Sequence, residues 1–420
     1  MQFESFFEAQ SAMLWGVFII AVVMGALVNK TNFCTMGAVS DLVNMGDTGR
    51  MRAWLFAIAI ATIGVTLLEY LGMIDLGGTF PPYRGSNLVL GENIIGGLLF
   101  GIGMTLASGC GNKCLVRIGG GNIKSILVFA IIALISYFMI SPFPGSDQTL
   151  FSTLFYDWIR PLSVDLSTAQ DLGAIVGGEE PGSMRLVLGL LLGLLILAFV
   201  FKSAEFRGNF DNLLGGLVVG LAVLAAWYLT ATVSIDADGE VFSLGGYYEQ
   251  WDMLADSDEG KPAAGAPLST QSYTFINPMG QAGAYLLAGL DAALMTFGVV
   301  AVFGVVLGSL LWSLLSRSFR IEWFNSTSDV LNHLVGAILM GFGGTLAMGC
   351  TVGQAITGVS TLAVGSMLTF GAIFLGSALT MKVQYYKMVY EEEATLIKAL
   401  VTGLVDLKLL PESLRQLDAI

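Results

Sequence analysis

The fifteen residues G-G-L-L-F-G-I-G-M-T-L-A-S-G-C (Gly96–Cys110) return 240 positions later as G-A-I-L-M-G-F-G-G-T-L-A-M-G-C (Gly336–Cys350). Nine of the fifteen aligned positions are identical, and four of those nine are glycines. Each copy is therefore an apolar, glycine-interrupted segment that ends on a cysteine. Internal duplication with such segments in corresponding places indicates the binding site of a transporter. We expect a transport protein.

The composition places the chain in a membrane. Its 420 residues are 55% hydrophobic and only 12% charged, whereas a soluble domain carries about 25% charged residues. Nine segments have the roughly 17 to 25 apolar residues that a helical span needs, namely residues 12–29, 53–73, 92–109, 122–140, 185–202, 212–230, 285–315, 332–349 and 362–381. We expect an all-α polytopic membrane protein, a single integral membrane domain over residues 1–420, in a lipid bilayer.

The basic residues indicate an orientation. Residues 1–10 contain Glu4 and Glu8 but no basic residue, so the first apolar segment does not resemble a cleavable signal peptide. With the N-terminus outside, 15 of the 19 Lys and Arg residues fall in cytoplasmic segments. The positive-inside rule therefore predicts an external N-terminus and a cytoplasmic C-terminus. The net charge of −13 is not taken to indicate a basic partner, and we expect no nucleic-acid binding.

The repeat predicts two inverted halves. The offset from the first copy to the second spans five predicted helices, an odd number, so the copies should run in opposite directions across the membrane. The halves would cover residues 1–183 and 184–390, the second with an outer loop at 232–277, followed by a cytoplasmic amphipathic segment at 391–420. A weaker match through a shared Met-Gly aligns N-F-C-T-M-G-A (Asn32–Ala38) with I-N-P-M-G-Q (Ile276–Gln281) and places Asn277 opposite Cys34.

Three cysteines share one local setting. After each of Cys34, Cys110 and Cys350, an apolar helix has stopped and a weakly apolar stretch of seven to ten residues begins. Such a stretch is too short to span and fits a re-entrant half-helix, which is tolerated at that depth only where it is buried in protein or lines a polar path. The free N–H groups of the half-helix would point at the sulfur and could hold an anion. We expect a central path for a small anion with thiols along it.

The residues around these cysteines extend the candidate binding site. Small neighbours would leave room for an oxyanion, Thr351 and Gln354 could donate hydrogen bonds, and Lys113 with Arg117 could attract an anion, although both also satisfy the positive-inside rule. Cysteine is often a buried structural residue, but its recurrence at one repeat position favours function. Cys114 aligns with Gln354 in the second copy of the repeat, so the repeat indicates a functional thiol there less strongly. The candidate substrate-binding residues are Cys34, Cys110, Cys350, Gly109, Gly111, Gly349, Thr351, Gln354, Asn277 and Lys113.

Other classes of site are not indicated. The chain has one histidine, and no carboxylate lies beside a cysteine, so the ligand set of a metal site is missing. No catalytic triad, P-loop or dinucleotide-binding glycine pattern occurs in its required context. We expect no metal, no cofactor and no enzymatic activity. The four cysteines avoid the long outer loops, where structural disulfides would form, so we expect free thiols.

The chain resembles the YeeE/YedE family of sulfur-compound transporters. The resemblance rests on N-F-C-T-M-G-A-V-S-D (Asn32–Asp41), on the first repeat copy and on G-F-G-G-T-L-A-M-G-C-T-V-G-Q (Gly341–Gln354). It implies an hourglass of two inverted helical halves in the bacterial inner membrane, with Cys34, Cys110 and Cys350 in central loops. It also implies that thiosulfate passes along these thiols by transient S–H hydrogen bonds, often towards a TusA-like sulfur carrier in the cytoplasm. The extra Cys114 and two long outer loops depart from this pattern.

Three other functions stay open at this level. A membrane thiol–disulfide oxidoreductase would need cysteine pairs within about 7 Å between Cα atoms, and Cys110 with Cys114 could form one. A selenium-compound transporter of the same family is a second alternative. A structural or assembly subunit is a third, but it leaves the repeated Gly-Cys loops unexplained. Our first choice is an importer of thiosulfate or a similar small sulfur oxyanion.

Overall fold

The computed structural model describes residues 1–178, 181–237, 239–255, 260–391 and 393–418. The predicted outer loop at 232–277 and the C-terminal segment at 391–420 are therefore described in part, as is the boundary region of the first half near residue 183.

Long apolar helices dominate the fold. Within the described ranges, nine helical segments are long and apolar enough to cross a membrane, which confirms the all-α polytopic class. Their helices are α1 (Phe6–Thr31), α3 (Gly49–Tyr70), η2 with α4 (Glu92–Gly96 and Gly97–Leu106), α6 (Ile123–Ile140), α10 (Pro181–Phe201), α12 (Phe210–Thr232), α16 (Phe297–Leu315), α17 (Thr327–Leu346) and α18 (Val364–Tyr390).

One predicted span was drawn too long. The segment 285–315 is not one helix, because the chain breaks at Gly289 and Leu290, which both have left-handed backbones with φ of 72° and 67°. Asp291 then caps the short helix η4 (Ala292–Leu294), and Thr296 caps α16 through the amide of Val299. The residues before the break belong to a separate helix, α15 (Ile276–Leu287).

Short helices fill the centre and the two ends. The central ones are α2 with η1 (Thr35–Ser40 and Asp41–Met45), α5 (Gly111–Gly119), α15 and η5 (Val352–Gly358). The others are α7 (Leu150–Leu154), α8 (Tyr156–Ile159), η3 (Arg160–Leu162), α9 (Leu172–Gly177), α11 (Ala204–Gly208), α13 (Leu244–Glu249), α14 (Trp251–Leu254), α19 (Leu396–Asp406) and η6 (Glu412–Leu414).

Two small sheets complete the elements. In the first, β4 (Ser234–Ala237) pairs with β1 (Gln2–Phe3) in parallel and with β5 (Glu240–Ser243) antiparallel. In the second, β2 (Asn87–Leu88) and β3 (Val164–Asp165) pair antiparallel.

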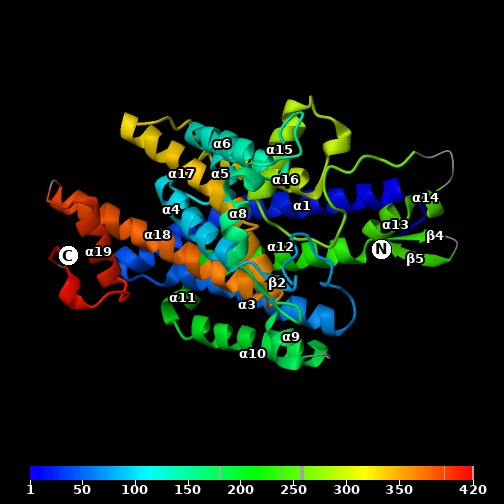
Figure 1. Ribbon diagram of the computed structural model, residues 1–420, viewed down its shortest axis with the longest axis horizontal. Coiled ribbons are helices and arrows are strands. Elements are labelled where there is room, and N and C mark those ends of the chain that lie inside the picture. Colours follow the sequence, from blue (N-terminus) through cyan, green and yellow to red (C-terminus); the bar gives the residue numbers. More distant parts are fainter. Residues whose placement is uncertain (179–180, 238, 256–259, 392, 419–420) are drawn as a thin grey trace.

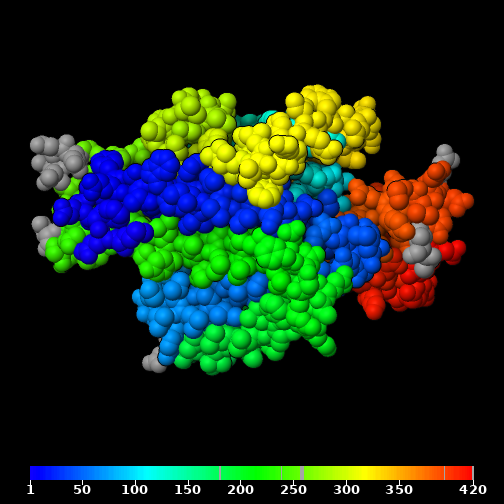
Figure 2. All heavy atoms as spheres, turned by 180° about the vertical axis from the view of Figure 1, so that it is seen from behind, coloured from blue at the N-terminus to red at the C-terminus, as the bar shows by residue number. Residues whose placement is uncertain are grey.

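The two chain ends lie at opposite ends of the molecule. Figure 1 shows the N-terminus beside β4, β5, α13 and α14, and the C-terminus beside α19 at the far end. Helix α1 runs along the outside (Figure 2, dark blue) and exposes large apolar side chains such as Trp15 and Ile19, which are 62% and 59% exposed. Apolar side chains on an outer helix face are what lipid contact requires. Which end faces the cytoplasm stays a prediction.

Both copies of the duplicated segment end in the same way. Helix α4 stops at Leu106 and α17 at Leu346, and the second residue after each, Ser108 and Met348, has a left-handed backbone with φ of 59° and 54°. In each copy the next glycine N–H donates to a carbonyl five residues back, at 2.8 Å. This is a Schellman-type ending. It delivers both cysteines to the same position relative to their helices.

A buried ion cluster supports the turn that follows η5. Arg84 is 5% exposed, pairs with Glu69 and donates from Nε to the Thr361 carbonyl at 2.9 Å. Arg185 binds Asp171 through two hydrogen bonds of 2.9 and 2.8 Å. Two of the four basic residues that the orientation places outside are thus neutralised within the protein, as burial requires.

Candidate transport site

Cys110 lies at the start of a short helix. It is the N-cap of α5, has an extended backbone and is 2% exposed. The hydroxyl of Thr35 donates to its sulfur at 3.9 Å. The helix N-terminus and this hydroxyl surround the sulfur with hydrogen-bond donors.

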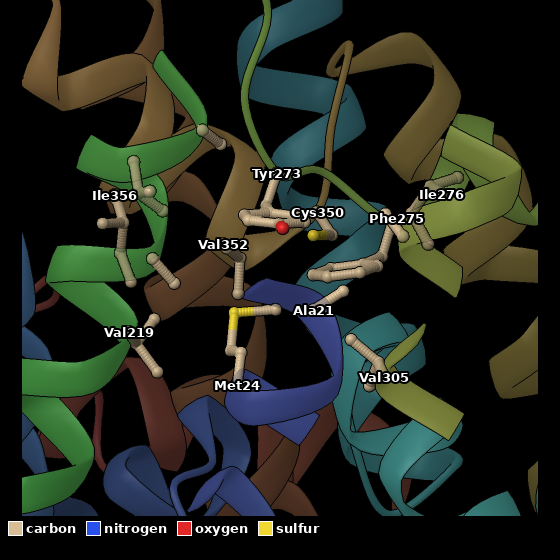
Figure 3. Close-up of a cluster of buried hydrophobic side chains, with 14 of the residues drawn as sticks. Ala21, Met24, Val219, Tyr273, Phe275, Ile276, Val305, Cys350, Val352 and Ile356 are labelled. Carbon is tan, nitrogen blue, oxygen red and sulfur yellow. The ribbon is translucent and has the colours of Figure 1, made fainter. Parts of the chain in front are cut away.

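Cys350 occupies the corresponding place in the second copy. It is fully buried and directly precedes the helical residues that begin at Thr351. The Gly353 N–H donates to its sulfur at 3.5 Å, so the first turn of this helix points at the thiol as predicted. Figure 3 shows Cys350 beside the rings of Tyr273 and Phe275, which stack with a centroid separation of 6.2 Å. Two aromatic rings therefore border the Cys350 end of the site.

Cys34 is the N-cap of α2 and is 6% exposed. The residues that follow the two outer thiols both approach the Cys110 sulfur: Thr35 follows Cys34 and donates to this sulfur at 3.9 Å, and Thr351 follows Cys350 and lies beside it. Cys110 is therefore the middle member of a row of three thiols, which we call the thiol row. Its members come from three different helix starts, and all three are free thiols.

Two buried hydroxyls beside the row lack a well-formed hydrogen bond to any described residue. They are Thr351 Oγ1 and Thr274 Oγ1. Thr351 is fully buried and lies next to Cys110, while Thr274 packs over Gly349 and Gly353. A buried polar group without a partner costs about 1–3 kcal/mol. These hydroxyls can donate to a polar ligand or a water molecule that enters the row.

The predicted glycines border the row. A Cβ built on Gly111 would lie 3.0 Å from Ile276 Cδ1, one on Gly349 would lie 3.2 Å from Thr274 Oγ1, and one on Gly109 would lie 3.2 Å from Lys113 Cγ. Each position is tight without a side chain. Gln354 is buried and donates to the Ala347 carbonyl, so one of its amide protons holds the end of α17.

Asn277 lies in the first turn of α15. It lines a recess of about 270 Å³ together with Ser136, Gln281 and Thr296. The residue directly before α15 is Phe275, not Asn277. The Met-Gly alignment is displaced by two residues from the helix starts, since the N-caps of α2 and α15 are Cys34 and Phe275. The structure therefore places an aromatic ring where the alignment placed an amide.

Cys114 lies near Cys110 as well, but we do not count it in the row because its sulfur is already engaged elsewhere. Its sulfur donates to the Ser125 carbonyl at 3.1 Å, which ties α5 to α6. In the described part of the chain, no group of His, Cys, Asp and Glu side chains is arranged to hold a metal ion.

Three basic residues meet at the Cys34 end of the row. Lys113 donates to Asn32 Oδ1 and interacts electrostatically with Cys34, Cys110, Arg117 and Arg50. Arg50 lies against Gly37 and pairs with Asp41. The sequence indicated Lys113 and Arg117 but gave no reason to select Arg50, whose position depends on how α3 packs against α2. It also gave no reason to select Thr35, Tyr273, Thr274 or Phe275.

The helices and the buried row define a multi-pass membrane protein with three free thiols buried in its interior. A family model described as sulphur transport matches residues 30–379. The chain belongs to this family, which confirms the resemblance to YeeE/YedE proteins, and it is a sulfur-compound transporter.

Relatives support the same class. The chain is 25% identical to the thiosulfate transporter TsuA of Escherichia coli (strain K12) over 82% of this chain and 87% of that protein. It is 24% identical to the thiosulfate transporter TsuA of Spirochaeta thermophila over 87% of this chain and 97% of that protein. A shorter match, 32% identical over 27% of this chain and 24% of the relative, is to the probable transporter YedE of Salmonella typhimurium.

Proposed function

We propose that this protein imports thiosulfate across a bacterial inner membrane and passes it along the thiol row from Cys350 through Cys110 to Cys34. The observation that carries the proposal is the row itself. Three free, buried thiols stand at separate helix starts, and the residues after Cys34 and Cys350 both approach the Cys110 sulfur. Relatives that align over most of both chains are named thiosulfate transporters.

The chemistry of the row suits an oxyanion with a terminal sulfur. A thiol is a weak donor, and Thr35, Thr351 and the Gly353 amide add further donors along the path. Weak and repeated hydrogen bonds let an anion enter without holding it too tightly to leave. Entry of the anion at Cys350 needs no charged group there, because these neutral donors contact it. The substrate would move by exchanging one donor for the next.

The redox alternative is not favoured. It would need Cys110 and Cys114 to form a reversible disulfide, but Cys114 is buried and donates to the Ser125 carbonyl. A transfer of sulfur to a small TusA-like carrier at the Cys34 end remains part of the proposal. So does an orientation with the C-terminus in the cytoplasm.

Uptake of labelled thiosulfate into proteoliposomes tests the function. The wild-type protein should accumulate the label, and Cys110→Ala or Cys350→Ala should reduce the initial rate by at least about tenfold at equal protein incorporation. Cys110→Ser is the sharper variant, because it keeps a donor but replaces the polarisable sulfur. Near-wild-type uptake by either alanine variant would contradict passage along the row.

A further inference from the structure

We propose that Arg50, Lys113 and Arg117 form a binding subsite for a divalent oxyanion at the Cys34 end of the thiol row, and that the transported anion is held most tightly there. The inference rests on the proposed function for the identity of the anion. It goes beyond that function because it assigns the tight-binding step to cations and not to thiols.

Lys113 and Arg117 present their charges on one face of α5. They are four residues apart, which is one helical turn, and both lie over Gly109. A Cβ built on Gly109 would stand 3.2 Å from Lys113 Cγ and 3.9 Å from Arg117 Nη1. The Lys113 ammonium donates to Asn32 Oδ1, two residues before Cys34. This face of α5 therefore looks towards the end of the row.

Arg50 approaches the same place from another helix. It belongs to the first turn of α3, and its guanidinium lies against Gly37 of α2, where a side chain would have to displace it. Its guanidinium pairs with Asp41 through two hydrogen bonds and interacts more weakly with Asp47. It also interacts electrostatically with Cys34. Arg50 is thus present at the subsite with its charge largely compensated.

The other two cations are not compensated. Several basic residues at this end of the molecule have carboxylate partners, including Lys30 with Asp211 at 3.8 Å and Lys124 with Asp329 at 2.7 Å. Among the residues that the structure describes, no carboxylate forms an ion pair with Lys113 or Arg117. Lys113 uses one donor on Asn32 and, as an ammonium, has two more. Two uncompensated positive charges match the two negative charges of thiosulfate or sulfate.

The two ends of the row therefore differ in charge. The groups against Cys350 are the neutral Tyr273, Phe275 and backbone of Gly353. The like charges of Lys113 and Arg117 repel each other at the Cys34 end, whereas a dianion bound between them is attracted to both. The electrostatic difference cannot by itself set the direction of net flux. It decides where along the row the anion rests.

The test measures anion binding to the full-length purified protein in nanodiscs by isothermal titration calorimetry. The probes are sodium thiosulfate and sodium sulfate as dianions and sodium thiocyanate as a monoanion, at constant ionic strength. Lys113→Gln and Arg117→Gln should each weaken dianion binding by at least about tenfold, but thiocyanate binding by no more than about threefold, because Coulomb energy scales with ligand charge. Lys113→Arg should restore most of the affinity.

Arg317→Gln is the matched control. Arg317 is an exposed cation just after α16 that has no ion pair with a described carboxylate and lies outside the subsite. Its removal should change dianion affinity by less than about twofold. An equal loss in Arg317→Gln would mean that overall charge, and not a built site, attracts the anion, and would overturn the proposal.

Asp41→Asn should strengthen dianion binding, the opposite of the effect expected for Lys113→Gln and Arg117→Gln. It frees Arg50 from its carboxylate, so dianion affinity should rise several-fold even though loss of the buried ion pair lowers the melting temperature; a general structural defect would weaken binding instead. Unchanged dianion binding in both Lys113→Gln and Arg117→Gln overturns the subsite, whatever Asp41→Asn does. Cation-dependent dianion binding without thiosulfate uptake by the wild type would instead contradict the proposed function and leave the subsite standing.

Discussion

Gly96 and Gly343 lie backbone to backbone where the two duplicated segments cross, so that a Cβ built on Gly343 would stand 2.7 Å from the Gly96 carbonyl oxygen. Their counterparts in the repeat, Gly336 and Gly103, make the same contact in exchange, with a Cβ on Gly103 placed 2.6 Å from the Gly336 carbonyl oxygen. Reciprocal contacts between corresponding residues are characteristic of two copies packed around a local two-fold axis. A two-fold axis that relates the complete halves stays a prediction.

This contact predicts that Gly343→Ala destabilises the protein. The new methyl group would strike the Phe100 amide as well as the Gly96 carbonyl, and backbone on both sides leaves little freedom to relax. Overpacking of this kind costs about 1–3 kcal/mol, which should appear as a lower melting temperature in detergent. Gly371→Ala on α18 is the control, because nothing lies within 4 Å of the position that its new methyl group would take. Equal melting temperatures for the two variants would show that the crossing tolerates a side chain.

Cys114→Ser should retain most thiosulfate uptake. The Cys114 thiol donates to the Ser125 carbonyl at 3.1 Å outside the thiol row, and a serine hydroxyl can keep a hydrogen bond there. A polar exchange of this kind lowers the free energy of unfolding by about 1–2 kcal/mol. The protein stays folded, so uptake should fall by less than about threefold. A redox shuttle predicts instead that Cys114→Ser is as damaging as Cys110→Ala. A Cys110–Cys114 disulfide detected by mass, together with equal loss in both variants, would reject the transport mechanism.

The thiols should differ in the side from which they react. An impermeant thiol reagent should label Cys350 first from the outside and Cys34 only from the cytoplasmic side, if the positive-inside orientation holds. Labelling should be slow for both, since Cys350 is 0% and Cys34 is 6% exposed. Saturating thiosulfate should slow it further. Single-cysteine variants followed by mass spectrometry measure this, and the reversed pattern would invert the proposed direction of import.

The contact between α19 and α18 should loosen in acid. Asp406 accepts from Tyr386 at 2.9 Å and from Arg415 at 2.8 Å, and it pairs with Lys382 at 3.3 Å. Burial by itself raises the pKa of Asp406, but the hydrogen bonds from Tyr386 and Arg415 and the charge of Lys382 outweigh it and leave the pKa below its usual value. A lowered carboxylate pKa gives stability that is complete above the unfolded pKa of about 3.9 and is lost as pH falls through the folded pKa.

Hydrogen exchange of the α19 amides, corrected for the intrinsic pH dependence, measures this loosening. Protection in the wild type should fall below about pH 4, where the carboxylate begins to protonate. Asp406→Asn should already be less protected at pH 7 and should change little between pH 5 and pH 3. Parallel acid profiles for the two proteins would assign the loosening to another group.

Much of the site was available from the sequence, because duplication makes function visible without coordinates. The repeated Gly-Cys ending predicted two matched thiols, and the short stretches after Cys34, Cys110 and Cys350 predicted three half-helices that the structure contains. Hydropathy predicted nine spans, and it failed only where Gly289 and Leu290 break a continuous apolar run into α15 and α16. Hydropathy counts side chains and does not detect a left-handed backbone.

The tertiary structure alone decided which groups face the thiols. Helices distant in the chain had to pack before Arg50 could lie near Cys34 and Thr35 could donate to Cys110. The start of α15 decided that Phe275, and not Asn277, is the residue before it. Local sequence determines that an apolar segment will be a helix, since backbone hydrogen bonds must be satisfied within it in lipid. The neighbours of its ends are set by close packing between helices, and a single residue of register changes them.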